Sequence, residues 1–314
     1  MGRFVVRRTL QSLVALLGVS VVVFLLIHLV PGDPIRAALG TQFDEELYQL
    51  LRERSGLDQP LIVQYGDWLL RAFQGDLGVS FRSGAPVTAV LAARIPPTAT
   101  LALAALLVGL VVALPAGIIS AIRQGKTADY LATGFSQIGV SIPDFWYGIL
   151  LILVFAVWLG WLPPLGYTPF TEDPVDFVKR MILPAVTAGV VTGAILTRFV
   201  RSAVLEALNS DHVRLARAKG LPERYILRHH VLRNAWIPIV TVIGLQLGTL
   251  LGGIVIVEVV FAWPGLGRLA LDAVERRDYP VLQGAVLFIA GAFLFINLLV
   301  DLLYAKLDPR ISTR

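Results

Sequence analysis

The sequence has no cysteine among its 314 residues. Disulfide bonds, zinc sites built on thiolates and catalysis by a cysteine nucleophile are therefore excluded. Histidine is almost as scarce, with four residues, which leaves little material for a histidine metal site. We expect no metal site, no catalytic residue and no bound cofactor in this chain.

Charge is also scarce. Only 16% of the residues are charged, against about 25% in a typical soluble domain. Hydrophobic residues make up 56% of the chain, and the mean hydropathy is +0.74. This composition indicates a membrane protein. The net charge of +5 is compatible with nucleic-acid binding, but the positions of the charges favour a membrane, so we expect no nucleic-acid partner.

Six segments are apolar enough to cross a bilayer, which takes about 20 residues. A positively charged start, with Arg3, Arg7 and Arg8, makes the first segment similar to a signal peptide. Its apolar core is too long for one and no small-residue cleavage site follows, so we expect a retained span. The six spans cover about 9–30, 98–120, 130–160, 183–203, 234–260 and 283–304.

Basic residues give the orientation, because Lys and Arg concentrate on the cytoplasmic side of a membrane. With the N-terminus inside, four inner segments hold 16 of the 27 basic residues: 1–8, 121–129, 198–233 and 305–314. The opposite orientation would place the richest basic block outside. The sequence therefore predicts an all-α integral membrane protein with six spans and both termini in the cytoplasm.

The predicted organisation has four parts. Within the second part we expect one helix over 45–55, capped by Asp44, and another from Pro60 to near Gly75. The third part contains a cytoplasmic loop over 204–233 and an outer element over 262–282. The four parts are an N-terminal span over 1–30, an extracytoplasmic helical subdomain over 31–97, a five-span core over 98–304 and a tail over 305–314.

The third span contains the break "SIPDFWYG" at 141–148. Pro143 interrupts the helical hydrogen bonds, and Ser141 or Asp144 is expected to cap a helix that restarts over 145–161. An acid inside a span is a functional candidate, so Asp144 either caps a kink or lines a path. The candidate path residues are Gln137, Ser141, Asp144, Gly244, Gln246, Gly248 and Gly252.

Two small-residue ridges recur every four residues, Ala185, Gly189 and Gly193 in the fourth span and Gly244, Gly248 and Gly252 in the fifth. Such ridges let membrane helices approach closely. They either pack helices together or also line a path between two subunits. Glu258 and Asp301 lie near span ends, where each is an interfacial or paired acid or, alternatively, part of a proton relay.

The segment "SAIRQGKT" at 120–127 ends like a phosphate-binding loop. Such a loop needs a glycine where this chain has Ser120, and it follows a strand rather than a membrane span. We therefore expect no nucleotide site here.

The longest basic stretch is "DHVRLARAKGLPERYILRHHVLRNAWIP" at 211–238. It predicts a helix capped by Asp211 and ended by a left-handed Gly220, then a second helix starting at Pro222. Val213, Ala216 and Gly220 lie along one face of the first helix. Topology alone accounts for the charge, together with contacts to anionic lipid. The small residues and the fixed turn indicate a surface that docks into a partner.

This stretch resembles the cytoplasmic loop of ATP-binding-cassette importer permeases, whose signature is Glu-Ala-Ala, three residues and Gly. Those places hold Arg214, Leu215, Ala216 and Gly220 here, so the Glu and the first Ala are absent. The form "RLARAKGL" is similar to the dipeptide, oligopeptide and nickel group, closest to the dipeptide permease subunit of the B type. Agreement extends to "PGDP" (31–34), "GDLGVSFRSGAPV" (75–87), "FAWPGLGRL" (261–269), "RRDYPVLQG" (276–284) and "NLLVDLLYAKLDPRI" (297–311).

The resemblance implies a type I importer permease fold in a prokaryotic cytoplasmic membrane. It implies a second related permease subunit, two ATPase subunits that bind ATP and Mg, and an extracytoplasmic peptide-binding protein. This chain would be non-catalytic, and the loop at 211–232 would couple it to an ATPase. The implied coupling residues are Arg214, Ala216, Arg217, Ala218, Lys219, Gly220, Leu221, Pro222, Arg224 and Tyr225.

Other classes remain as alternatives. A secondary carrier would need paired inverted repeats and an ion site, but no internal repeat is visible and Asp144 is the one acid well inside a span. A channel or a membrane-embedded enzyme would need a selectivity ring or a nucleophile–base pair, and neither is visible. Within the favoured class, dipeptides or short oligopeptides are the expected cargo, and nickel chelates and glutathione are the alternatives.

Overall fold

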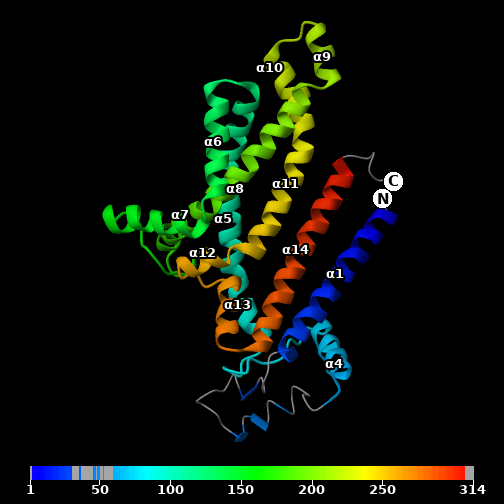
Figure 1. Ribbon diagram of the computed structural model, residues 1–314, viewed down its shortest axis with the longest axis vertical. Helices are drawn as coiled ribbons and strands as arrows, with labels where there is room; N and C mark the ends of the chain where they lie inside the picture. Colours follow the sequence, from blue (N-terminus) through cyan, green and yellow to red (C-terminus); the bar gives the residue numbers. More distant parts are fainter. Residues whose placement is uncertain are drawn as a thin grey trace.

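The computed structural model describes residues 2–29, 35–36, 45–46, 48–49, 52 and 59–307. Regular structure in these ranges is helical (Figure 1), apart from one isolated antiparallel bridge between Val79 and Pro86. The helices are α1 (Gly2–Leu29), α4 (Leu61–Phe73), α5 (Val87–Ile122), α6 (Thr127–Ser141), α7 (Asp144–Leu151), the π-helix η2 (Ile152–Trp158), α8 (Pro174–Leu208), α9 (Asp211–Ala218), α10 (Glu223–Ile226), the π-helix η3 (Leu227–Val231), α11 (Leu232–Gly253), α12 (Val255–Val260), α13 (Leu266–Glu275) and α14 (Tyr279–Leu307).

Long helices run between two ends of the molecule (Figure 1). The loop end carries α9 and α10 together with the turn between α5 and α6, and the opposite end carries α4 and α13. Five helical segments are long and apolar enough to cross a membrane: Val5–Leu25, Val87–Ile122, Pro174–Leu208, Glu223–Gly252 and Tyr279–Tyr304. They confirm five of the six expected spans.

The third expected span differs from the prediction. Its two halves, α6 and the α7–η2 pair, meet at a bend of 99° after Ser141, so they do not form one kinked rod over 130–160. α7 projects sideways from the bundle (Figure 1). The helix restarts at Asp144, whose carboxylate accepts the N–H of Phe145 at 2.9 Å. Pro143 occupies the position before the helix and no side chain caps it, so the expectation of a cap by Ser141 or Asp144 is wrong. The Ser141 hydroxyl donates to the carbonyl of Gln137 instead.

α5 and α8 form the centre of the bundle and meet through glycines. A Cβ on Gly189 would lie 2.7 Å from Val108, and one on Gly109 would lie 3.2 Å from the backbone of Gly193. These close approaches confirm that the ridge in the fourth span packs helices together. Around this contact, Leu101, Ala105 and Leu196 are fully buried.

At the α4 end, hydrogen bonds connect residues that lie far apart in the sequence. They involve the stretches 75–87, 261–269 and 276–284, which carry the family resemblance. The buried Asp278 accepts hydrogen bonds from the Ser80 hydroxyl and from the N–H of Phe81. Glu258 is also buried, and its carboxylate accepts the Thr98 hydroxyl at 2.7 Å and the Arg268 N–H at 2.9 Å. The Glu258 carboxylate therefore accepts a backbone N–H in the first turn of α13, and Glu258 is a buried, hydrogen-bonded acid.

The N- and C-terminal helices lie side by side (Figure 1). Arg8 of α1 and Asp301 of α14 approach to 3.3 Å, so Asp301 is a paired acid. α4, which begins after Pro60 as expected, packs on α1 through Tyr65, whose ring lies 5.3 Å from that of Phe24. The helix expected over 45–55, with its cap at Asp44, lies largely outside the described residues.

Candidate functional site

The loop between α8 and α11 is a defined helix–turn–helix. α9 ends in a hydrogen-bonded turn in which the Gly220 N–H donates to the carbonyl of Arg217 and the Leu221 N–H to that of Ala216. This double pattern requires a left-handed residue after the helix, and Gly220 has φ +76°. The prediction for Gly220 is confirmed. Pro222 immediately precedes α10, and Ser210, rather than Asp211, occupies the position before α9.

The inner face of α9 packs into the chain's own core. Val213 and Ala216 are buried against Val200 and Val204 of α8, and Leu221 packs on the same cluster. The expectation that the small side chain of Ala216 permits approach by a partner is therefore wrong. Its methyl group faces α8 because Val213 and Ala216 share one face at a spacing of three residues.

The outer face of α9 is basic and exposed, with one large apolar residue at its centre. Leu215 is 58% exposed, and it is the residue that sequence reasoning missed on this surface. Its presence between cations is typical of a contact that buries an apolar side chain inside a charged rim. The exposed members of the predicted coupling set are Arg214, Arg217, Ala218, Lys219, Gly220, Pro222, Arg224 and Tyr225.

A solvent-exposed ion pair spans the turn between α9 and α10. Arg217 donates from Nε to Glu223 Oε1 at 2.7 Å and from Nη2 to Oε2 at 3.4 Å. The hydrogen bond that Arg217 donates to this carboxylate raises the pKa of Arg217 above its usual value, so the guanidinium remains charged. Arg217 thus holds α9 against α10, a role that the sequence did not reveal because Glu223 lies across the turn.

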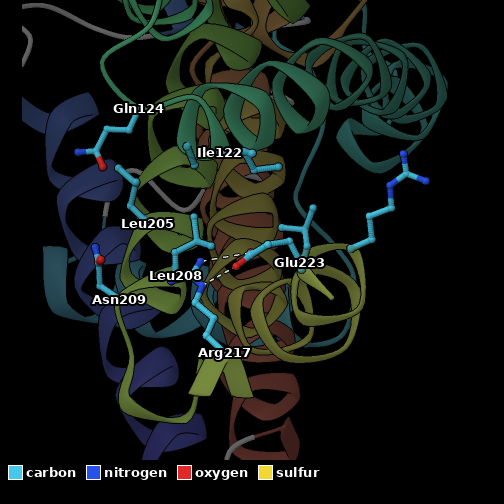
Figure 2. Close-up of a pocket in the computed structure, with 10 residues that line it drawn as sticks. Ile122, Gln124, Leu205, Leu208, Asn209, Arg217 and Glu223 are labelled. Carbon is cyan, nitrogen blue, oxygen red and sulfur yellow. Dashed lines mark hydrogen bonds and ion pairs between the residues drawn. The ribbon is translucent and has the colours of Figure 1, made fainter. Parts of the chain in front are cut away.

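A cavity of about 450 Å³ opens behind this ion pair (Figure 2). Ile122, Leu205 and Leu208 supply apolar walls, while Gln124 and Asn209 lie on one side of it (Figure 2). The cavity is lined by residues of the α9–α10 turn and of the ends of α5 and α8, and it lies beside the buried cluster that packs α9 on α8. A second hydrogen bond spans the loop, where Asn234 Nδ2 of α11 lies 2.8 Å from His212 Nε2 of α9.

The segment 120–127 folds as the end of α5, a turn and the start of α6. Gly125 has φ +73°, and its N–H donates to Asp129 rather than pointing into an anion-binding loop. No strand precedes it, since α5 runs unbroken to Ile122. The structure thus agrees with the expectation that this segment is not a phosphate-binding loop.

The candidate path residues separate into two groups. Gln137 and Ser141 are exposed on α6, and Asp144 and Gln246 are partly exposed on α7 and α11. These four side chains remain accessible to a path or to a partner subunit.

The three glycines of the fifth span belong to a different surface. A Cβ on Gly244 would lie 2.1 Å from Val300, one on Gly248 would lie 3.2 Å from Phe293, and Gly252 faces Ile289. All three neighbours are on α14 of the same chain. The ridge therefore packs α11 on α14, and the placement of Gly244, Gly248 and Gly252 on the path stays a prediction.

Two family models match the sequence. The model described as "Binding-protein-dependent transport system inner membrane component" matches residues 113–313, and its N-terminal companion matches residues 1–102. The glutathione transport system permease protein GsiC of Escherichia coli (strain K12) is 43% identical over 311 residues, covering 99% of each chain. GsiC of Shigella dysenteriae serotype 1 shows the same identity and coverage.

Solved structures share the fold at low identity. A chain of the MetNI methionine ABC transporter in inward-facing conformations aligns with a TM-score of 0.55 and 19% identity, covering 70% of this chain and 96% of that one. A chain of an amino acid ABC transporter aligns with a TM-score of 0.52 and 17% identity, covering 70% and 94%.

Proposed function

The chain belongs to the family of binding-protein-dependent transport system inner membrane components, the permease subunits of ATP-binding-cassette importers, and from this premise we propose that it moves short peptides into the cell. It is a multi-pass membrane subunit and is not an enzyme by itself. Such permeases work with ATPase subunits and a substrate-binding protein.

The observation that carries the coupling role is the α9–α10 loop. It is held by its own core and by the Arg217–Glu223 pair, and it presents Leu215 among exposed cations. A rigid projection of this kind can receive force from a partner, whereas a flexible loop would absorb it. We assign this surface to one ATPase subunit, which binds ATP and Mg outside this chain.

We propose that the loop end faces the cytoplasm and that a second, related permease completes the path. The basic residues gathered at the loop end support this orientation. The accessible residues Gln137, Ser141, Asp144 and Gln246 are the candidate path lining, and rocking of the two permeases around them provides alternating access.

Short peptides are the cargo that we propose first. Glutathione is the second candidate, because the relatives at 43% identity are described as glutathione permeases. Glutathione is itself a short peptide with free carboxylates, so the two candidates differ in backbone linkage rather than in overall chemistry.

Purification through a tag on this chain, followed by mass spectrometry and reconstitution into proteoliposomes, tests the function. We expect a second permease and two ATPases to copurify, and radiolabelled dipeptide to accumulate only with ATP and the binding protein. Competition by unlabelled glutathione, dipeptide and nickel–histidine chelate then ranks the cargo. Uptake driven by a proton gradient without ATPase subunits would identify a secondary carrier instead.

A further inference from the structure

Asp129 is the most heavily hydrogen-bonded acid at the loop end among the described residues. It lies in the first turn of α6 and is only 5% exposed. Its carboxylate accepts the Ser120 hydroxyl at 2.5 Å and the Gly125 N–H at 2.9 Å. Arg201 of α8 donates to both carboxylate oxygens, from Nε at 2.7 Å and from Nη2 at 3.0 Å. One side chain thus joins α5, the following turn, α6 and α8.

Arg201 lies on the part of α8 that leads into the coupling loop. Its neighbours Val200 and Val204 are buried together with Val213 of α9 and Ile226 of α10. This shared core makes the end of α8 and the α9–α10 loop one packed body. Any displacement of the loop therefore reaches Arg201 directly.

Further along its length, α6 meets α8 through an apolar contact. Gly139 approaches Ala194 so closely that a Cβ would lie 2.5 Å from it, but this apolar contact has no directional partner. Tyr130, Leu131 and Ile138 are exposed on the other faces of α6. A two-point guanidinium–carboxylate contact adds a fixed direction to this packing, because both hydrogen bonds must keep their geometry.

We propose that Asp129 and Arg201 form a clamp that transmits movement of the coupling loop to α6. The proposal rests on the proposed function, because it supposes that an ATPase moves the loop. α6 carries Gln137 and Ser141 on its exposed surface, so the clamp links the coupling surface to candidate path residues. A buried ion pair adds little net stability, and its use here is to fix position. We assign Asp129 and Arg201 as positioning residues, because Asp129 is buried and the Arg201 guanidinium is bonded to it.

A distance measurement tests the clamp directly. The chain has no cysteine, so in the purified chain, before assembly, Leu131→Cys on α6 and Glu206→Cys on α8 are the two sites that take a spin label. In the reconstituted complex we expect the distance between the two spin labels to have one narrow distribution. This distribution should not change when vanadate traps nucleotide on the ATPase subunits. Asp129→Asn should broaden or shift it on trapping. An unchanged narrow distribution in Asp129→Asn would overturn the proposal.

A transport measurement separates positioning from folding. Asp129→Asn should lower peptide uptake per ATP hydrolysed by about tenfold, a typical coupling between two sites, while assembly and ATP hydrolysis persist. Arg201→Lys keeps the charge but not the two-point contact, and should give an intermediate ratio. A merely structural role would lower assembly, hydrolysis and uptake together, and that pattern in both variants would contradict the clamp.

Asp176→Asn is the matched control. Asp176 also lies in the first turn of a helix and pairs with an arginine, Arg180, at 2.6 Å, but both residues belong to α8. We expect its uptake per ATP to equal that of the unaltered chain. If the unaltered complex shows no ATP-driven uptake, the proposed function fails, while the spin-label distances still decide whether the clamp holds α6 to α8.

Discussion

At the scale of single residues, some positions strongly favour glycine, because of the backbone conformation or because of a neighbouring side chain. Gly220 and Gly265 illustrate two different reasons. Gly220 has a left-handed φ of +76° but open space around it, whereas a Cβ on Gly265 would lie 1.8 Å from the Glu258 carboxylate. The first position is restricted by conformation and the second by volume.

Replacing Gly220 with Val should uncouple ATP hydrolysis from uptake. The left-handed conformation costs a residue with a Cβ about 1–2 kcal/mol, so the α9–α10 turn should open while membrane insertion continues. Gly220→Asn should be tolerated, because Asn adopts this conformation more readily. The ratio of uptake to hydrolysis in proteoliposomes measures the effect. Gly75→Val, with φ +84° at the far end, is the control, and unchanged uptake in Gly220→Val would contradict the assigned role.

Gly265→Ala should destabilise the whole fold. The new methyl group displaces the buried Glu258 carboxylate from the first turn of α13, which we expect to cost about 3 kcal/mol through overpacking and lost hydrogen bonds. Thermal unfolding of the purified chain in detergent measures the change. Gly66→Ala on α4, where a Cβ meets nothing within 4 Å, should leave the unfolding temperature unchanged or slightly higher. Equal unfolding temperatures for the two variants would refute this packing.

At the scale of elements, two pairs of helices pack through glycines, and we expect them to differ in their tolerance of substitutions. α5 and α8 are locked through several close glycine contacts, and α11 meets α14 through the Gly244 ridge. The contact between α11 and α14 is specific, because Gly244 faces a single side chain, Val300, which is 8% exposed. The contact between Gly244 and Val300 can therefore be tested by substituting both residues together.

Gly244→Ala should cost about 1–3 kcal/mol, because the added methyl group overlaps Val300. Val300→Ala removes the overlapping methyl groups, so the double variant should be more stable than the two separate losses predict. Unfolding temperatures of the two single variants and of the double variant form the measurement. Strict additivity would show that α11 and α14 do not meet at this point.

At the scale of the whole molecule, the two ends differ in expected environment. Arg214, Arg224 and Lys126 are exposed at the loop end. Ser83 is exposed at the opposite end, in the turn whose Phe81 N–H donates to Asp278. If the loop end is cytoplasmic, the hydrophobic spans separate these positions by the full membrane.

Single cysteines should reveal this orientation in intact cells, since the native chain has none. Ser83→Cys should react with a membrane-impermeant maleimide, while Lys126→Cys should react only after the membrane is opened. Both side chains are exposed, so accessibility within the protein is not limiting. The reverse labelling pattern would place the loop end outside and remove the proposed ATPase contact.

Local signals allowed much of the fold to be predicted. Long apolar runs identified the spans, and Gly220 with Pro222 identified the α9–α10 turn, because these features depend on neighbouring residues. The 99° bend after Ser141 depends on what packs around α7, so Pro143 indicated a break but not its angle. The Asp129–Arg201 pair joins residues 72 positions apart, and one sequence contains no signal for such pairing.

The division of α9 into an inward and an outward face has a consequence for divergence among related transporters. Val213 and Ala216 serve the fold, whereas Arg214, Leu215 and Lys219 lie on the exposed side. Mutations on the exposed side can therefore accumulate without unfolding the subunit. After gene duplication, a few substitutions on the exposed side of α9 could change which ATPase subunit the permease binds, while the helical bundle stays intact.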